Sequence, residues 1–293
     1  MFDLAAATAF MATHARLLDR RRFELLVDRG RPDAALDALE GYRNADGGYG
    51  WGLEPDLRSP ESQPAGALHA LEVFAEVGPT TAPRAAEVCD WLASASLDDG
   101  GLPFAVPVTD PAGCAPFWAG ADSSTSSLHI TAAVCSIANR VAAHDPAVAA
   151  HPWLASATEF CLGAIERLTE PHAIELMYVL HFLDSLVDHH PDAHALLERT
   201  ARNFLPADGS MHVAGGLEDE RLLPLDFSPR PDRPLRALVP PDAIAADLER
   251  WRSSQQDDGG WVVDFASSSP VAALEWRGYA TVRAITLLIA NDG

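Results

Sequence analysis

A short glycine-rich segment recurs along this chain, and its spacing limits the folds that the sequence can adopt. Each copy is an aspartate followed by glycine and then by glycine or serine. The copies are Asp46-Gly47-Gly48, Asp99-Gly100-Gly101, Asp208-Gly209-Ser210 and Asp258-Gly259-Gly260. Their aspartates are 53, 109 and 50 positions apart. Since the middle interval is about two periods, the chain contains a repeat of about 50 residues with one eroded copy.

The segments that flank the glycine turns predict helices. Asp-Gly is also a common hairpin turn, but stretches rich in Ala, Leu, Glu and Arg precede the copies. These stretches are residues 33–42, 84–95, 192–204 and 242–254. Apolar helical stretches follow at 64–77, 123–141 and 270–290, and the eroded unit has helices at 152–168 and 171–187. The repeating unit is therefore helix, glycine turn, loop, helix.

Two copies carry a more specific pattern. The last copy continues as Gln255-Gln256-Asp257-Asp258-Gly259-Gly260-Trp261, and the first has Asn44 in place of the glutamine and Tyr49 and Trp51 after the glycines. This pattern resembles the glutamine-tryptophan repeat of squalene-hopene cyclases and related terpene cyclases, and the broader prenyltransferase and squalene-oxidase repeat. The resemblance covers the chain from about residue 33 to its end, and it implies an α/α toroid whose inner helices line a central cavity.

We therefore expect an all-α fold, an α/α toroid of about five to six helical hairpins. Hairpins that cannot bury their apolar faces alone must stack or close on themselves. We expect one domain over residues 1–293, with an N-terminal helical segment at 1–32 and the repeat region at 33–293. An open solenoid is the alternative to a closed ring.

The loop after the first glycine turn carries candidate site residues. In a toroid such loops gather over the mouth of the cavity. Glu54 and Asp56 are candidate catalytic residues, a general acid and its partner. Trp51 and Arg58 are candidates for binding substrate, Arg58 through an anionic group. The alternative is a salt-bridged loop that fixes the geometry of the ring.

The longest insertion, residues 211–240, is a candidate lid with Asp226 as a third catalytic candidate. A surface turn is the alternative for Asp226. Class II terpene cyclases protonate an alkene with an Asp-x-Asp-Asp motif, and this chain has none.

The loop of the second repeat supplies aromatic candidates. Phe117 and Trp118 suit an apolar or cationic ligand, because aromatic faces stabilise positive charge, although core packing explains them equally well. Cys114, Asp110 and His129 lack the spacing of a zinc site. We expect no metal and no cofactor.

Histidines recur in the helices that follow the loops. His69 precedes Glu72 and Glu76, and His181 precedes Asp184 and Asp188, each at spacings of three and seven residues. Such spacing forms one polar stripe on a helix. We expect His69, and His129 of the second repeat, to line the cavity; the alternative is a hydrogen bond within a helical wall.

Trp276 and Arg277, near the start of the last helix, complete the list of substrate-binding candidates. First and last repeats meet in a closed toroid. We therefore expect this pair to neighbour the loop of Glu54, Asp56 and Arg58, with the insertion around Asp226 across from it.

Charge and composition exclude several functions. The 21 basic residues are all arginine, so lysine chemistry such as a Schiff base is absent. A net charge of −21 repels nucleic acid. The four cysteines are widely spaced, which fits a reducing compartment. The stretch from Met1 to Arg22 predicts a folded helix instead of an export signal. No apolar stretch is long enough to span a membrane. We expect a cytoplasmic protein.

Three functions follow, in order of preference. The first is a terpene cyclase-like or prenyltransferase-like protein that binds or transforms an apolar, isoprenoid-type small molecule by acid-base chemistry. The second is a non-catalytic module that binds a basic protein partner through its acidic surface. The third is a carbohydrate-active α/α toroid, since paired carboxylates with tryptophans also suit sugar rings. The sequence leaves open whether the protein is an enzyme.

Overall fold

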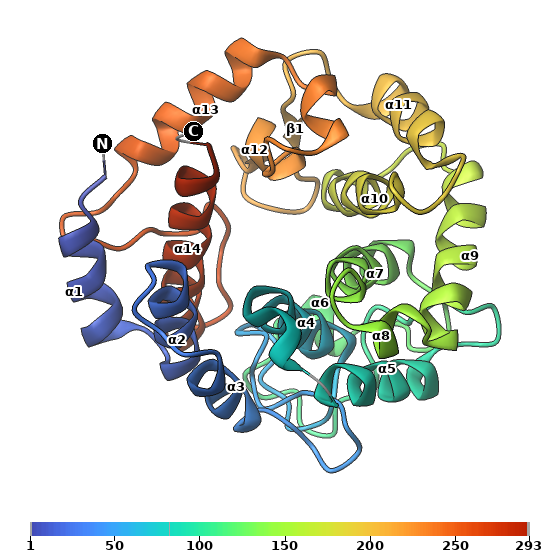
Figure 1. Ribbon diagram of the computed structural model, residues 1–293, viewed down its shortest axis with the longest axis horizontal. Coiled ribbons are helices and arrows are strands. Elements are labelled where there is room, and N and C mark those ends of the chain that lie inside the picture. The colour runs from blue at the N-terminus through green and yellow to red at the C-terminus, as the bar shows by residue number, and fades with distance from the viewer. Residues whose placement is uncertain (1, 82, 292–293) are drawn as a thin grey trace. The chain divides into compact units, whose positions relative to one another are not determined.

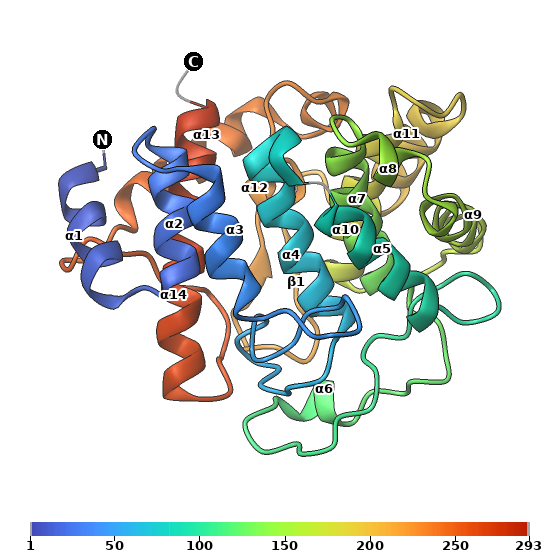
Figure 2. The same cartoon turned by 60° about the horizontal axis from the view of Figure 1, so that its bottom comes forward.

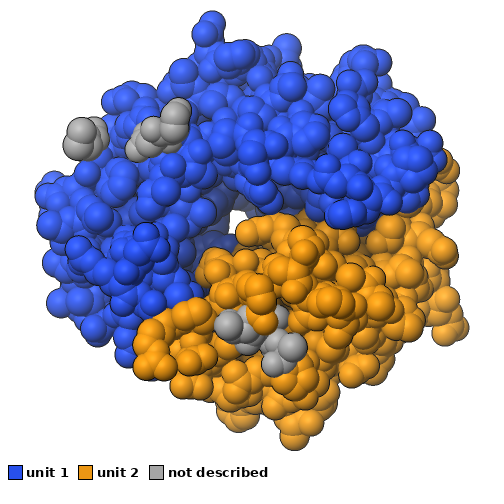
Figure 3. All heavy atoms as spheres, viewed as in Figure 1, with its two compact units in different colours: residues 1–30, 170–293 blue, residues 31–169 orange. Residues whose placement is uncertain are grey.

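The computed structural model describes residues 2–81 and 83–291. These residues are mostly helical, apart from loops, two short 3-10 helices and a two-stranded antiparallel hairpin, β1 (Met211–His212) with β2 (Arg221–Leu222) (Figure 1). The expected all-α class is confirmed. None of the described helices is both long and apolar enough to cross a membrane. The chain divides into two compact units, unit 1 with Met1–Gly30 and Glu170–Gly293, and unit 2 with Arg31–Thr169 (Figure 3).

Unit 2 is built around two neighbouring helices, α4 (Pro64–Val77) and α7 (Leu128–Ala142). Its other elements are α3 (Pro32–Glu40), η1 (Gly78–Thr81), α5 (Arg84–Ala95), α6 (Pro116–Ala119), α8 (Pro146–Ala149) and α9 (Pro152–Glu166). Helix α4 packs against α3, α5 and α7, and α7 packs against α8 and α9. Nearly all of α4 is buried, including His69. A polar side chain on this helix therefore needs a partner inside the protein.

Unit 1 joins the two ends of the chain. Its elements are α1 (Leu4–His14), α2 (Leu17–Leu26), α10 (Ala173–Leu186), α11 (Ala193–Phe204), the hairpin β1–β2, α12 (Pro224–Phe227), η2 (Pro234–Leu238), α13 (Pro241–Ser253) and α14 (Pro270–Asn291). Helix α14 packs against α1, α2 and α13, and α10 packs against α11, α12 and η2. Phe10, Trp251, Trp261 and Ile285 belong to its apolar core.

The glycine turns share one local structure. In each copy the aspartate Oδ1 accepts a hydrogen bond from the backbone N–H two residues later, at 2.9 to 3.2 Å. The residue between them is a glycine with φ of +70° to +92°, a conformation that side chains with a β-carbon rarely adopt. Both parts of the Asp-Gly pattern are therefore needed to form the turn.

Three of the turns pack against a helix in the same way. The first glycine lies on a helix backbone: Gly47 on Glu87 of α5, Gly100 on Ser156 of α9 and Gly259 on Ala6 of α1. The second glycine lies under an aromatic ring of the same helix, which is Trp91, Phe160 or Phe10. In the last repeat α1 thus occupies the place that α5 and α9 occupy in the first two.

Two of the predicted helices differ from the structure by more than two residues at an end or by a break. The stretch 123–141 begins its helix only at Leu128, because Ser124 and Thr125 form a turn on Asp122 and Ser126 donates to Asp99. The N-terminal stretch is two helices, α1 and α2, that separate at Ala15; Met1 lies outside the described residues.

Candidate functional site

Two loops of unit 2 come together where α4 begins (Figure 2). We call residues 51–63 and 103–127 the loop cluster. Leu57 forms a β-bridge with Cys114, and the backbone N–H of Ala115 donates to the Asp56 carbonyl at 2.7 Å. The Gln63 side chain holds the second loop by bonding both the N–H and the carbonyl of Val106. These contacts hold the two loops together within unit 2.

A histidine of α4 lies between two carboxylates, one of which comes from the first loop of the cluster. His69 Nε2 lies 2.9 Å from Glu54 Oε2, and its Nδ1 lies 3.1 Å from Glu72 Oε2. Burial alone would lower the pKa of His69, but the charges and hydrogen bonds of Glu72 and Glu54 outweigh it and raise the pKa to about 9. The imidazole therefore carries a proton at neutral pH.

The first loop is folded tightly around this group. Glu54 Oε1 accepts the backbone N–H of Asp56 at 3.1 Å, and Asp56 itself is only 4% exposed. The guanidinium of Arg58 lies against Gly52, where a β-carbon would sit 3.6 Å from Cζ. Glu54, Asp56 and Arg58 thus belong to one compact turn beside His69.

The second loop adds an aromatic group. Trp118 on α6 stacks on Phe104 with ring centroids 4.4 Å apart and planes 10° apart, and His129 lies 5.2 Å from the same Phe104 ring. Phe117 is 5.5 Å from Trp118 and is 59% exposed. Phe104 was not among the sequence candidates, although it follows the second glycine turn as Trp51 follows the first.

This arrangement combines an acid-base group with an aromatic surface. A protonated imidazole between two carboxylates orients both of them, and a histidine paired with carboxylates is an arrangement found at acid-base sites. A pair of this kind also occurs as a purely structural ion pair. Glu54, Asp56, Arg58 and His69 form one group, and Phe117, Trp118 and His129 gather around Phe104 in a second group, while Trp51 Nε1 donates to Asn44.

Asp226 lies in unit 1 and is buried at 8% exposure. Its carboxylate accepts the backbone N–H of Leu223 at 2.7 Å, which caps α12, and it also pairs with Arg283 of α14. The Asp226 carbonyl accepts a hydrogen bond from His181 Nε2 at 2.9 Å. The side chain therefore ties α12 to α14, while its backbone is tied to α10.

The predicted polar stripes differ between α4 and α10. The pairing of His69 with Glu72 is present, but Asp184 accepts the backbone N–H of Leu235 and pairs with Arg233 instead of His181. Burial lowers the pKa of His181 to about 4, assisted by the charge of Arg283. His181 is thus neutral where His69 is charged.

The candidates on α14 have partners within unit 1. Trp276 packs edge-on against Phe265 and Tyr279, with centroids 5.2 and 5.4 Å away. Arg277 donates to Asp258 Oδ1 at 2.7 Å and lies over the Phe10 ring. Arg277 thus braces the last glycine turn. The expected meeting of this pair, and of Asp226, with the first loop stays a prediction.

The sequence analysis did not identify the side chains that donate hydrogen bonds to the aspartates of the glycine turns. Ser62 donates to Asp46 Oδ1 at 2.7 Å, and Ser126 donates to Asp99 Oδ1. Each serine stands two residues before the helix that follows its loop, which is a spacing that the sequence shows. In the last copy Arg277 supplies this donor.

Comparison with known proteins gives a likeness of fold. No family model matches the chain, and no curated protein matches it. A crystal structure of a protein from Actinoplanes is similar, with a TM-score of 0.54 and 15% sequence identity over 99% of this chain and 100% of that chain. At this identity the match concerns the fold alone. Among the described residues no group of three or more His, Cys, Asp or Glu side chains forms a metal site.

Proposed function

We propose that the protein binds an apolar, isoprenoid-type small molecule at the loop cluster and transforms it by acid-base chemistry. The observation that carries this proposal is that the loop whose Glu54 bonds His69 is joined, through Asp56 and Ala115, to the loop that carries the exposed Phe117. An exposed large aromatic side chain next to stacked rings suits an apolar ligand.

The roles of the residues follow from their partners. Glu54 and Asp56 are the acid-base candidates, and His69 is a positioning residue that holds a proton against Glu54. Phe117 and Trp118 provide the surface for the ligand. The resemblance to terpene cyclases supports the choice of an isoprenoid, although the acid that this protein uses would differ from their Asp-x-Asp-Asp motif.

The proposal includes a closed α/α toroid as the architecture. Support comes from the last glycine turn, which packs on α1 as the earlier turns pack on α5 and α9. Gln255 adds to this by accepting the N–H of Asp3 and donating to its carbonyl. An open solenoid would leave its last turn without such a helix. A small-angle scattering profile distinguishes the compact ring from the longer solenoid.

Ligand binding is tested by titration calorimetry with farnesol, and with glycerol as a polar comparison. We expect farnesol to bind the wild type, and Phe117→Ser to weaken binding about tenfold, which is the usual effect of removing one large apolar contact. Leu17→Ser is the matched control, because Leu17 is 58% exposed but lies in unit 1. Equal affinities of the two variants would remove the loop cluster from the proposal.

A further inference from the structure

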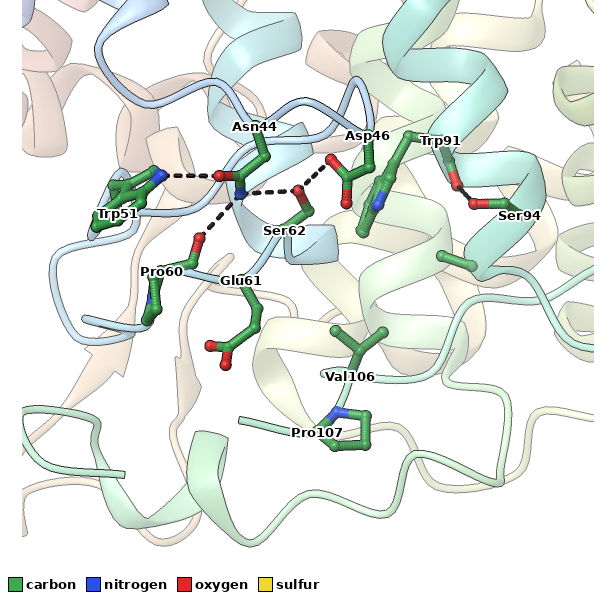
Figure 4. Close-up of a pocket in the computed structure, with 11 residues that line it drawn as sticks. Asn44, Asp46, Trp51, Pro60, Glu61, Ser62, Trp91, Ser94, Val106 and Pro107 are labelled. Atoms are coloured by element: carbon green, nitrogen blue, oxygen red, sulfur yellow. Dashed lines mark hydrogen bonds between the residues drawn. The ribbon is translucent and has the colours of Figure 1, made fainter. Parts of the chain in front are cut away.

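An open cleft of about 510 Å³ lies beside the first glycine turn, within unit 2 (Figure 4). Trp51 and Trp91 stand on opposite sides of the cleft, and Asn44 and Ser62 lie between them. The remaining lining residues are Asp46, Pro60, Glu61, Ser94, Ala95, Val106 and Pro107. This volume is within the range of small-molecule sites.

The charged side chains that line the cleft are all negative. Asp46 and Glu61 are its charged residues, and both are acidic. Glu61 accepts hydrogen bonds from the Ser59 hydroxyl and from the backbone N–H of Thr109, and these bonds lower its pKa to about 2. Glu61 therefore stays negatively charged at neutral pH and well into the acid range.

Most of the uncharged polar groups that line the cleft are hydrogen-bonded to other groups of the protein. The Asn44 amide donates to the Pro60 carbonyl and to Ser62 Oγ, and its oxygen accepts from Trp51 Nε1 at 2.7 Å. Ser94 donates to the Trp91 carbonyl. A ligand with many hydroxyl groups would find few free partners here, whereas a cation needs only the charge and the aromatic faces.

Trp51 is held in an unusual conformation. Its φ is +56°, in the left-handed region that side chains with a β-carbon seldom adopt, and 58% of the residue is exposed. Two hydrogen bonds fix it, from its N–H to the Ser59 carbonyl and from Nε1 to Asn44. The protein thus fixes an exposed indole at the edge of an acidic cleft, at a cost in backbone strain.

We infer that this cleft binds a small organic cation, a quaternary or protonated amine, on the exposed indole of Trp51, with the edge of Trp91 opposite, and against Glu61 and Asp46. Tryptophan is the best of the aromatic residues for cation–π contact, and the two carboxylates complement the charge. The cleft shares part of the loop cluster with the proposed function, but His69, Glu54 and Phe117, which carry that proposal, do not line it.

The test compares choline with 3,3-dimethyl-1-butanol, a neutral molecule of the same shape, by calorimetry at fixed ionic strength. We expect choline to bind and the neutral analogue to bind at least about tenfold more weakly, because the charge is removed while the shape is kept. Equal binding of both probes, or binding of neither, would overturn the inference.

Variants locate the site. We expect Trp51→Ala to weaken choline binding about fivefold and Trp51→Phe to restore part of it. Glu61→Gln should weaken it as well, while Glu198→Gln, which removes the same charge from a half-exposed position in unit 1, should leave it unchanged. Equal effects of the two charge variants would show only general attraction to an acidic protein. Binding of methyl glucoside without binding of choline would assign the cleft to sugars and contradict the inference.

Discussion

His69 and Glu54 are bonded across 15 positions of the chain, with Nε2 2.9 Å from Oε2. This contact joins the loop after the first glycine turn to the buried helix α4. Since Glu72 holds the other ring nitrogen, the imidazole is fixed on both sides and keeps its proton. The loop geometry and the protonation state of one histidine are therefore linked.

The first prediction is a pH dependence of stability that His69 causes. Its pKa is raised from 6.5 to about 9 in the folded state, so its contribution is fully present below pH 6.5 and is lost as the pH rises through 9. We expect the free energy of unfolding of the wild type to fall relative to His69→Gln over this range, by on the order of 3 kcal/mol. Urea titrations at pH 6, 7.5 and 9 measure the difference, and a constant difference would contradict the prediction.

His181 should act in the opposite direction. Its folded pKa is lowered to about 4, so the folded state resists protonation and stability is lost as the pH falls from 6.5 toward 4. We expect His181→Gln to reduce this acid sensitivity, although Gln replaces the Nε2–H donor to Asp226 and Phe227 imperfectly. The measurement is the slope of unfolding free energy between pH 6.5 and 4.5; a slope that matches the wild type would refute the assignment.

Asp56→Asn tests the acid-base role within the first loop. The amide has nearly the shape of the carboxylate, and the backbone contacts of Asp56 with Ala115 and Glu54 remain. We expect the variant to lose any activity on the bound small molecule while its thermal midpoint stays within a few degrees of the wild type. Full activity, or a much lower midpoint, would show that Asp56 serves the architecture of the loop.

Gly259→Ala tests the packing of the last turn on α1. A β-carbon here would overlap the Ala6 carbonyl, and the residue has a φ of +92°. We expect a loss of about 3 kcal/mol from strain and overpacking together. Gly215→Ala is the control, because its φ is +81° but no atom lies within 4 Å, so about 1 kcal/mol is expected. Equal losses in urea unfolding would indicate that α1 does not press on the turn.

The repeat could be predicted from the sequence because its parts are local. The Asp side chain and the glycine after it determine each turn within three residues, and Pro64 and Pro270 begin their helices as expected. Helices 64–77 and 84–95 have the predicted boundaries for the same reason. The start of α7 was harder to predict from the sequence, because it depends on a hydrogen bond from Ser126 to Asp99, 27 positions earlier in the chain.

The candidate sites depend on contacts that the sequence does not show. The spacing of His69 and Glu72 placed both on one helix face, and their hydrogen bond is the alternative left open for His69. Glu54 reaches His69 only because the loop folds back over α4. The same spacing on α10 did not pair His181 with Asp184, because Leu235 and Arg233 reach Asp184 from the insertion. Helix periodicity therefore indicates which residues share a face, whereas long-range segments decide their partners.

Native mass spectrometry of the protein purified from its source tests the central claim most directly. We predict a retained apolar small molecule whose mass is that of an isoprenoid, present in the wild type and in Leu17→Ser but depleted in Phe117→Ser. A polar ligand, or an apolar one retained equally by all three proteins, would contradict the assignment of isoprenoid binding to the loop cluster. So would a protein that carries no ligand and does not take up farnesol.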